Sequence, residues 1–151
     1  MSGFSVHLDN KILDHLFKGT AYATPTKYLA IFKAGDGLTE NTSATWSANE
    51  LSTTNDKAYH RIVLANSTFD AAANSAVVNN VNYEFPVAES DWGTVSHVAI
   101  MDAQTGGNVL AWGAIRNPVT LAEQPREILT GDQFIVRRET MVIRLNDHPT
   151  I

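Results

Sequence analysis

The sequence predicts an all-β fold, an antiparallel β-sandwich of about eight strands with one short N-terminal α-helix. Apolar residues alternate with a period of two in most segments after Pro25, which is typical of strands. Turn-forming Gly, Asn and Pro residues separate these short segments. No helical pattern alternates with the strands, which argues for an antiparallel sandwich and against a parallel sheet built from β-α-β units.

Composition limits the class of protein further. The 151 residues are expected to form a single domain spanning residues 1–151, with 44% apolar and 18% charged residues. A net charge of −5 without a basic cluster argues against nucleic-acid binding. The absence of cysteine excludes disulfides, thiolate catalysis and cysteine-ligated zinc. No apolar run is long enough to cross a membrane and no signal peptide is present, so we expect a protein made in the cytoplasm without membrane insertion.

The N-terminal helix is expected at about residues 8–18. Its apolar residues share one helical face: Leu8, Ile12, Leu13, Leu16 and Phe17. Gly19 ends the pattern, and either Ser5 or Asp9 is placed to cap its start. A short helix with one apolar stripe has to dock against something.

The strands are expected in order after Pro25. Residues 26–33 are apolar on both faces, which suits a strand between a second sheet layer and the helix. Residues 34–58 have no period and predict a long loop, with Trp46 and Leu51 as anchors. The other strand candidates are residues 59–64, 67–69, 75–80, 81–85 (ended by Pro86), 94–102, 108–115, 133–138 and 140–145.

The clearest hairpin joins residues 94–102 to residues 108–115 through a Gly-Gly turn that requires positive φ. On simple alternation, one core face would hold Val98 and Ile100 from the first strand with Leu110 and Trp112 from the second.

A serine and a histidine stand side by side in this hairpin, as Ser96 and His97, with Asp91 and Asp102 nearby. Neighbouring residues on a strand point to opposite faces, so this pair is not expected to make a nucleophile–base contact. The sequence also lacks a G-x-S-x-G elbow. We therefore expect no catalytic residues, no enzyme activity, and a half-buried His97 on the face of Val95, Ala99 and Met101.

Metal and cofactor sites are not predicted either. The five histidines are scattered without the spacing of a metal motif. Exposed aromatic residues are the remaining candidates for contact with a partner or a glycan. Trp46 and Trp92 lie in turn-like sequence and are expected to be exposed, whereas Trp112 and Tyr28 are expected in the core.

Several segments together resemble a family of small bacteriophage virion proteins, often labelled tail-fibre or minor structural proteins. They are ILDHLFKGTAY (12–22), PTKYLAIF (25–32), KAYHRI (57–62), DWGTVSHVAIMDAQTGGNVLAWGAI (91–115) and a terminal strand containing MVIRL. The segment 91–115 is the most distinctive. Two departures are Ala58, where the family commonly has glycine, and a longer stretch at residues 34–58.

The resemblance implies a non-enzymatic structural protein of the virion, either a tail-fibre-like component or a capsid decoration protein. It would assemble with copies of itself and with a tail or major capsid protein, after synthesis in the bacterial host cytoplasm. Loop 34–58 and the polar termini MSGFSVH and NDHPTI are the segments expected to reach neighbours. The alternative function is a carbohydrate- or host-receptor-binding module, motivated by Trp46 and Trp92.

Overall fold

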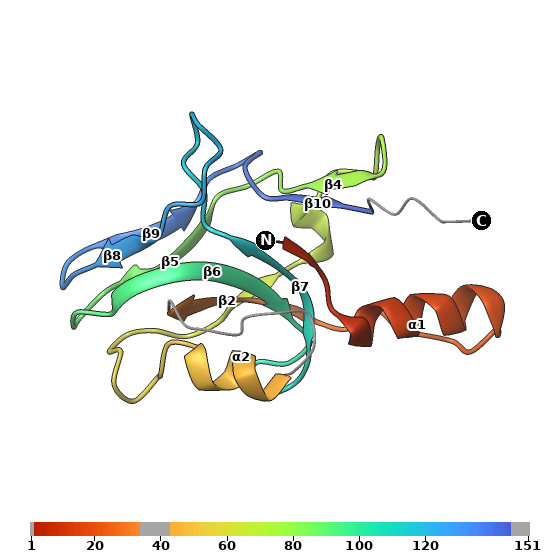
Figure 1. Ribbon diagram of the computed structural model, residues 1–151, viewed down its shortest axis with the longest axis horizontal. Coiled ribbons are helices and arrows are strands. Elements are labelled where there is room, and N and C mark those ends of the chain that lie inside the picture. Colours follow the sequence, from red (N-terminus) through yellow and green to blue (C-terminus); the bar gives the residue numbers. More distant parts are fainter. Residues whose placement is uncertain (1, 34–42, 146–151) are drawn as a thin grey trace.

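A sheet of six antiparallel strands forms the centre of the fold in the computed structural model, which describes residues 2–33 and 43–145 (Figure 1). Five strands follow the order β1-β7-β6-β2-β3, and β8 pairs with the first part of β6. Two smaller antiparallel pairs, β5-β9 and β10-β4, supply strands for a second layer. The predicted antiparallel sandwich with an N-terminal helix is confirmed.

The elements have the following bounds in chain order. They are β1 (Ser2–Phe4), α1 (Val6–Phe17), β2 (Lys27–Lys33), α2 (Ser43–Asn49), β3 (Ile62–Leu64), β4 (Ala76–Val78), β5 (Tyr83–Val87), β6 (Gly93–Met101), β7 (Val109–Ala114), β8 (Arg126–Ile128), β9 (Gln133–Val136) and β10 (Val142–Arg144). Helix α1 begins at Val6 because Ser5 caps it, accepting a hydrogen bond from the Leu8 backbone N–H at 3.2 Å.

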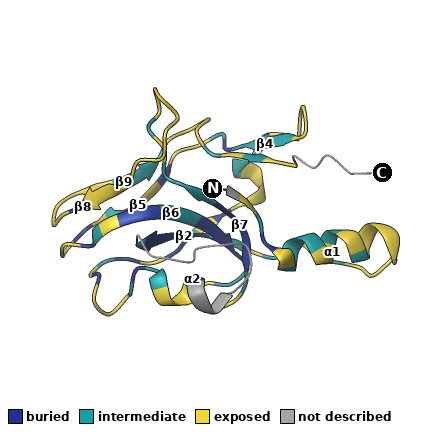
Figure 2. Ribbon diagram, in the orientation of Figure 1, coloured by how far each residue is buried: buried dark blue, intermediate teal, exposed yellow. Residues whose placement is uncertain are grey.

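The central sheet is buried on both faces, as Figure 2 shows by the dark β2, β6 and β7. One face packs against the second layer. Its buried residues include Leu29, Ile31, Val95 and Ile100 from the central sheet and Tyr83, Phe85 and Trp92 from the opposite side. The other face forms a smaller cluster under α2, made of Ala30, Phe32, Trp46, Ala99, Met101, Val109 and Trp112, with Tyr28 packed against it. The predicted two-sided burial of residues 26–33 is therefore correct, although the helix that covers them is α2 and not the N-terminal helix.

A β-bulge at Ser96 interrupts the alternation of β6. His97 lies opposite Phe32 of β2 while Val95 lies opposite Lys33, so Ser96 is an extra residue without a partner on β2. Val95 is therefore moved to the face that packs on the second layer, whereas His97 stays with the α2 cluster. The expectation that these two residues share a face is wrong for this reason.

A second bulge lies in β7 at Leu110. Ile100 of β6 is opposite Ala111 and Met101 is opposite Val109, so Leu110 is left without a partner. Leu110 and Ala111 both join the cluster on the second-layer side, and Trp112 turns to the α2 side. The predicted face holding Leu110 and Trp112 together is divided by this bulge.

Part of the predicted loop 34–58 is helical, because Ser43–Asn49 forms α2; residues 34–42 lie outside the described residues. A buried ion pair holds the chain just after this helix. Arg61 is 6% exposed and donates from Nε and Nη2 to the Glu50 carboxylate at 2.7 and 2.6 Å. Its Nη1 donates to the backbone oxygens of Ala103 and Gly106 in the β6–β7 turn at 2.6 and 2.8 Å. The pair thus joins the end of α2, the start of β3 and the hairpin turn. The guanidinium donates four hydrogen bonds, to a carboxylate and to two backbone oxygens, and these bonds offset the cost of burying its charge.

Other strand predictions need correction for local reasons. Residues 66–68 form a 3₁₀ turn instead of a strand, since the Thr68 N–H and hydroxyl both bond the Ala65 oxygen. Strand β5 continues through Pro86, where the pairing with β9 is irregular and needs no N–H donor. The short strands β1 and β8 were not predicted, because three residues are too few for a period to be read.

Ala58 adopts a left-handed conformation with φ of 71°. Alanine pays a steric cost in this region that glycine avoids. The conformation explains why glycine would suit this position.

The predicted positive-φ turn of the central hairpin is confirmed at Gly106 (φ 60°) and Gly107 (φ 74°), but the two sites differ in space. A Cβ on Gly107 would lie 2.4 Å from Asp102 Oδ1, the atom that accepts the Asn108 N–H at 2.6 Å. A Cβ on Gly106 meets nothing within 4 Å. Only Gly107 is therefore limited by packing as well as by conformation.

We expect Gly107→Ala to lower the free energy of unfolding by about 2–4 kcal/mol, because left-handed strain adds to a clash. Gly106→Ala should cost about 1–2 kcal/mol from strain alone. Urea unfolding of both variants measures the difference. Equal losses in the two variants would contradict the close approach of Asp102.

Candidate interaction surface

The two tryptophans predicted as exposed contact residues are both buried, so that expectation is wrong. Trp46 is 1% exposed and meets the Phe32 ring edge-on, with centroids 4.7 Å apart. Trp92 is 0% exposed, and its Nε1 donates to the Lys57 backbone oxygen at 3.0 Å. Both side chains hold their segments against the apolar sheet. The polar, turn-forming residues beside them in the sequence suggested exposure and gave no sign of this packing.

The burial of Trp46 predicts a large stability effect. Trp46→Ala should lower the free energy of unfolding by about 3–5 kcal/mol, because it removes the centre of the cluster under α2. Val119→Ala is the control; Val119 is 87% exposed, so its change should stay within about 0.5 kcal/mol. Thermal and urea unfolding measure both. An alanine at position 46 that leaves stability unchanged would disprove the packing described for this residue.

Trp112 is in the core as predicted, at 7% exposure. Its ring lies 5.4 Å from that of Trp46 and 6.0 Å from that of His97. Its indole N–H is buried and has no hydrogen-bond partner within the described part of the chain. Such a donor costs about 1–3 kcal/mol of stability.

Ser96 and His97 do form a hydrogen bond, contrary to the expectation from strand alternation. Ser96 Oγ and His97 Nδ1 are 2.7 Å apart. The bulge at Ser96 changes the direction of its side chain, so strict alternation does not hold at this one place. The sequence carries no signal for this bulge.

The contact does not extend to a catalytic arrangement in the described residues. Ser96 is only 8% exposed. Asp91 accepts hydrogen bonds from the backbone N–H and hydroxyl of Thr130, both at 2.8 Å, and Asp102 accepts from Asn108. Neither aspartate orients His97, as a nucleophile–histidine–acid triad would require.

Burial lowers the pKa of His97 below its ordinary value of 6.5. The neutral imidazole is favoured in the folded state, where the ring packs near Trp46 and Trp112. Above pH 6.5 His97 therefore does not reduce the free energy of unfolding. As the pH falls through 6.5, the free energy of unfolding decreases, because His97 in the unfolded chain binds a proton more readily than in the folded chain.

We expect the melting temperature to fall as the pH is lowered from 7.5 to 5. Part of this fall comes from protonation of His97 in the unfolded chain, so the His97→Gln variant should show a smaller fall. His60→Gln changes an exposed ring and serves as the matched control. Thermal unfolding at half-unit pH steps measures the slopes. The same slope in the wild type and in His97→Gln would show that this ring does not contribute.

Within residues 2–33 and 43–145, no cluster of three or more His, Asp or Glu side chains is arranged to hold a metal ion. Neither described helix has the length and apolar character needed to cross a membrane.

Helix α1 leaves the C-terminal part of its apolar stripe uncovered within the described chain. It projects from the body of the protein, and none of its residues is fully buried (Figures 1 and 2). Leu13, Leu16 and Phe17 are 52%, 67% and 80% exposed. The helix is fixed at its start, where Ser5 hydrogen-bonds the Val109 oxygen and its N–H donates to the Leu110 oxygen at 2.9 Å. The predicted stripe is present. Leu8 at its start packs against the main core, whereas Leu13, Leu16 and Phe17 at its end are not covered by the rest of the described chain.

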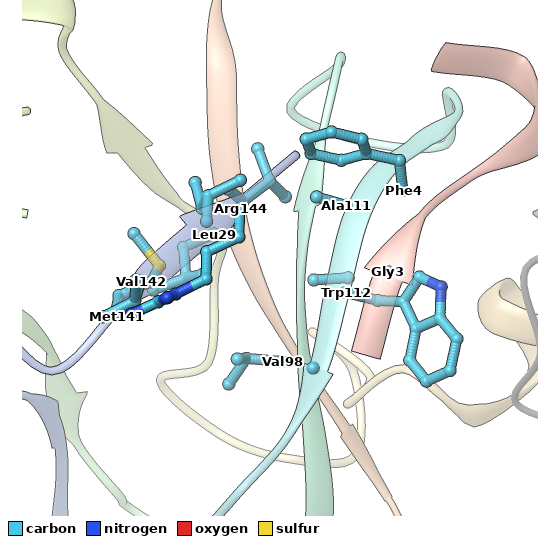
Figure 3. Close-up of a pocket in the computed structure, with 13 residues that line it drawn as sticks. Gly3, Phe4, Leu29, Val98, Ala111, Trp112, Met141, Val142 and Arg144 are labelled. Carbon is cyan, nitrogen blue, oxygen red and sulfur yellow. The ribbon is translucent and has the colours of Figure 1, made fainter. Parts of the chain in front are cut away.

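An apolar cleft of about 290 Å³ lies between the central sheet and β10. Figure 3 shows Phe4 and Ala111 on one side and Met141 and Arg144 on the other, with Val98 below, while the Trp112 ring points away. Arg144 is the one charged residue among those that line it. The strand β10 pairs with β4 and not with β1, which leaves the cleft open between them.

A projecting loop at residues 117–122 carries a third apolar feature. Asn117 Oδ1 accepts the N–H groups of Val119 and Thr120 at 2.8 and 3.0 Å, and Arg116 donates to the Leu121 oxygen at 2.9 Å. Leu121 has a positive φ of 59° and is 65% exposed. The loop is held by its own hydrogen bonds, and sequence reasoning did not identify it.

The segments predicted to reach neighbours are only partly described. Ser2–Phe4 of the N-terminal segment forms β1 on the edge of the central sheet. Residues 34–42 and the C-terminal residues 146–151 lie outside the described residues. The uncovered apolar surface found here lies instead on α1, in the cleft and on loop 117–122.

These features define a β-rich protein whose described part displays exposed apolar surface and no assembled catalytic centre. A family model described as Podophage GP4 fiber I protein gp80 matches residues 3–144. The chain belongs to this family of phage fibre proteins, which confirms the resemblance drawn from its segments. A search of curated proteins gives no match.

Proposed function

We propose that this protein is a non-enzymatic structural component of a bacteriophage virion, located at the tail and assembling there with copies of itself. The single observation that carries the proposal is the match of nearly the whole described chain to a phage fibre family. On this proposal the protein is made in the host bacterial cytoplasm and incorporated into particles.

The surface chemistry supports an assembly role. Large apolar side chains are exposed in groups on α1 and on loop 117–122, and grouped exposed apolar residues mark protein–protein contacts. Virion assembly repeats such contacts many times, so that weak individual contacts combine into stable attachment. A glycan-binding role has no comparable support, since Trp46 and Trp92 are buried.

Particles purified from the phage that encodes this chain test the proposal. We expect mass spectrometry to find the protein in gradient-purified virions, and antibody labelling in the electron microscope to place it on the tail. A lysis enzyme of the same phage is the control, because it should be lost during purification. Labelling over the capsid shell would contradict the tail position and indicate a capsid decoration protein. Purified particles that lack the protein would refute the proposal that it is a virion component.

A further inference from the structure

We propose that two copies of this chain associate by seating the α1 stripe of each copy in the cleft between β1 and β10 of the other. The stripe consists of Leu13, Leu16 and Phe17, and the cleft is lined by Phe4, Leu29, Val98, Ala111, Met141 and Arg144. The inference rests on the proposed function, for which it names the surface of self-association.

The end of the helix requires a cover that the described part of its own chain does not provide. Isolated helices shorter than about 12–15 residues are marginal in water, and α1 has 12 residues without a buried side chain. Phe17 lies in its last turn and is 80% exposed, far from the capped start. A second apolar surface over this end would stabilise both the helix and the contact.

The cleft has the size and chemistry to receive this stripe. An apolar cavity of about 150 Å³ holds a benzene molecule, whereas the cleft has a volume of about 290 Å³. One aromatic ring and part of a leucine therefore fit within it. Its walls are mainly apolar, and Phe4 offers an aromatic face to an incoming ring (Figure 3).

Opposite charges on the cleft and on α1 favour the helix of a second copy as the occupant of the cleft. Arg144 is the single charged residue of the cleft, is exposed, and makes no ion pair with any described residue. On α1 the carboxylate of Asp14 stands three residues before Phe17, on the flank of the stripe, and likewise has no described partner. Residues at this spacing are neighbours on a helix surface. Seating Phe17 in the cleft brings Asp14 to the rim, where Arg144 lies.

The positions of helix and cleft allow both contacts to form at once. Phe4 of the cleft wall is only two residues before Val6, the first residue of α1. The helix extends outward from the end of β1, away from the body of its own chain (Figure 1). In the proposed dimer a two-fold axis beside β1 would place each helix at the partner's cleft, and such a symmetric interface closes without further copies.

Charge reversal tests the interface in solution. The wild-type chain should be a dimer by light scattering and sedimentation. Asp14→Arg or Arg144→Asp alone should weaken dimerisation on the order of tenfold, and the double variant should recover most of the loss. Neither residue is buried, so melting temperatures of the dissociated proteins serve to show that both variants remain folded.

Apolar substitutions provide the second arm. Phe17→Ser should weaken the dimer by roughly thirtyfold or more, as loss of a central anchor does. Val119→Ser changes an equally exposed apolar residue on loop 117–122 and should leave the dimer unchanged.

Three outcomes overturn the inference: a monomer at all concentrations, a dimer indifferent to Phe17 and to both charge reversals, or reversals that do not compensate each other. A monomer whose stripe is covered only by another virion protein belongs to the first outcome. The virion experiment is independent. Particles that contain a monomeric chain would refute this interface alone, whereas particles without the chain would refute the proposed function whatever its oligomeric state.

Discussion

Burial of both faces of the sheet formed by β2, β6 and β7 is the requirement on which the rest of the fold depends. A strand such as Lys27–Lys33, with four consecutive fully buried residues, is stable only if each face is removed from water. The second layer of strands covers one face, and helix α2 with Trp46 covers the other. Arg61 then fixes that segment to the β6–β7 turn, so the smaller cover is held by polar contacts as well as by packing.

Alternation in the sequence was a reliable guide wherever the strands pair without interruption. It placed the residues of β2 on the correct faces, and it located β6 and β7 within one or two residues. It failed at Ser96 and at Leu110, where one extra residue reverses the direction of every side chain before it. A bulge depends on how two distant strands pair, and no local pattern records that. The Ser96–His97 hydrogen bond was missed for the same reason.

Tertiary anchoring limited the prediction of the candidate site. Trp46 and Trp92 stand among polar turn formers, and local sequence therefore favoured exposure for both. Their burial follows from what lies opposite them in space, namely Phe32 and Trp112 for one and Tyr59 for the other. The helical stripe of α1 could be read from its period, because a helix face is a local property. Whether the rest of the chain covers that stripe could not be read, since coverage is decided by the whole fold.

The apolar surface left over by the fold is not spread evenly. The two faces of the central sheet are covered completely enough that their residues are nearly all buried, while Phe17 at the far end of α1 remains in water. Single exposed leucines are common on protein surfaces and need no explanation. Grouped apolar side chains at the end of a short helix differ from them, because a short helix is only marginally stable unless its apolar face is packed against another surface. In a family of phage fibre proteins, this difference directs attention to contacts between chains. Within the described chain, the end of α1 contributes little to the core, and the proposed dimer gives its exposed apolar side chains a cover.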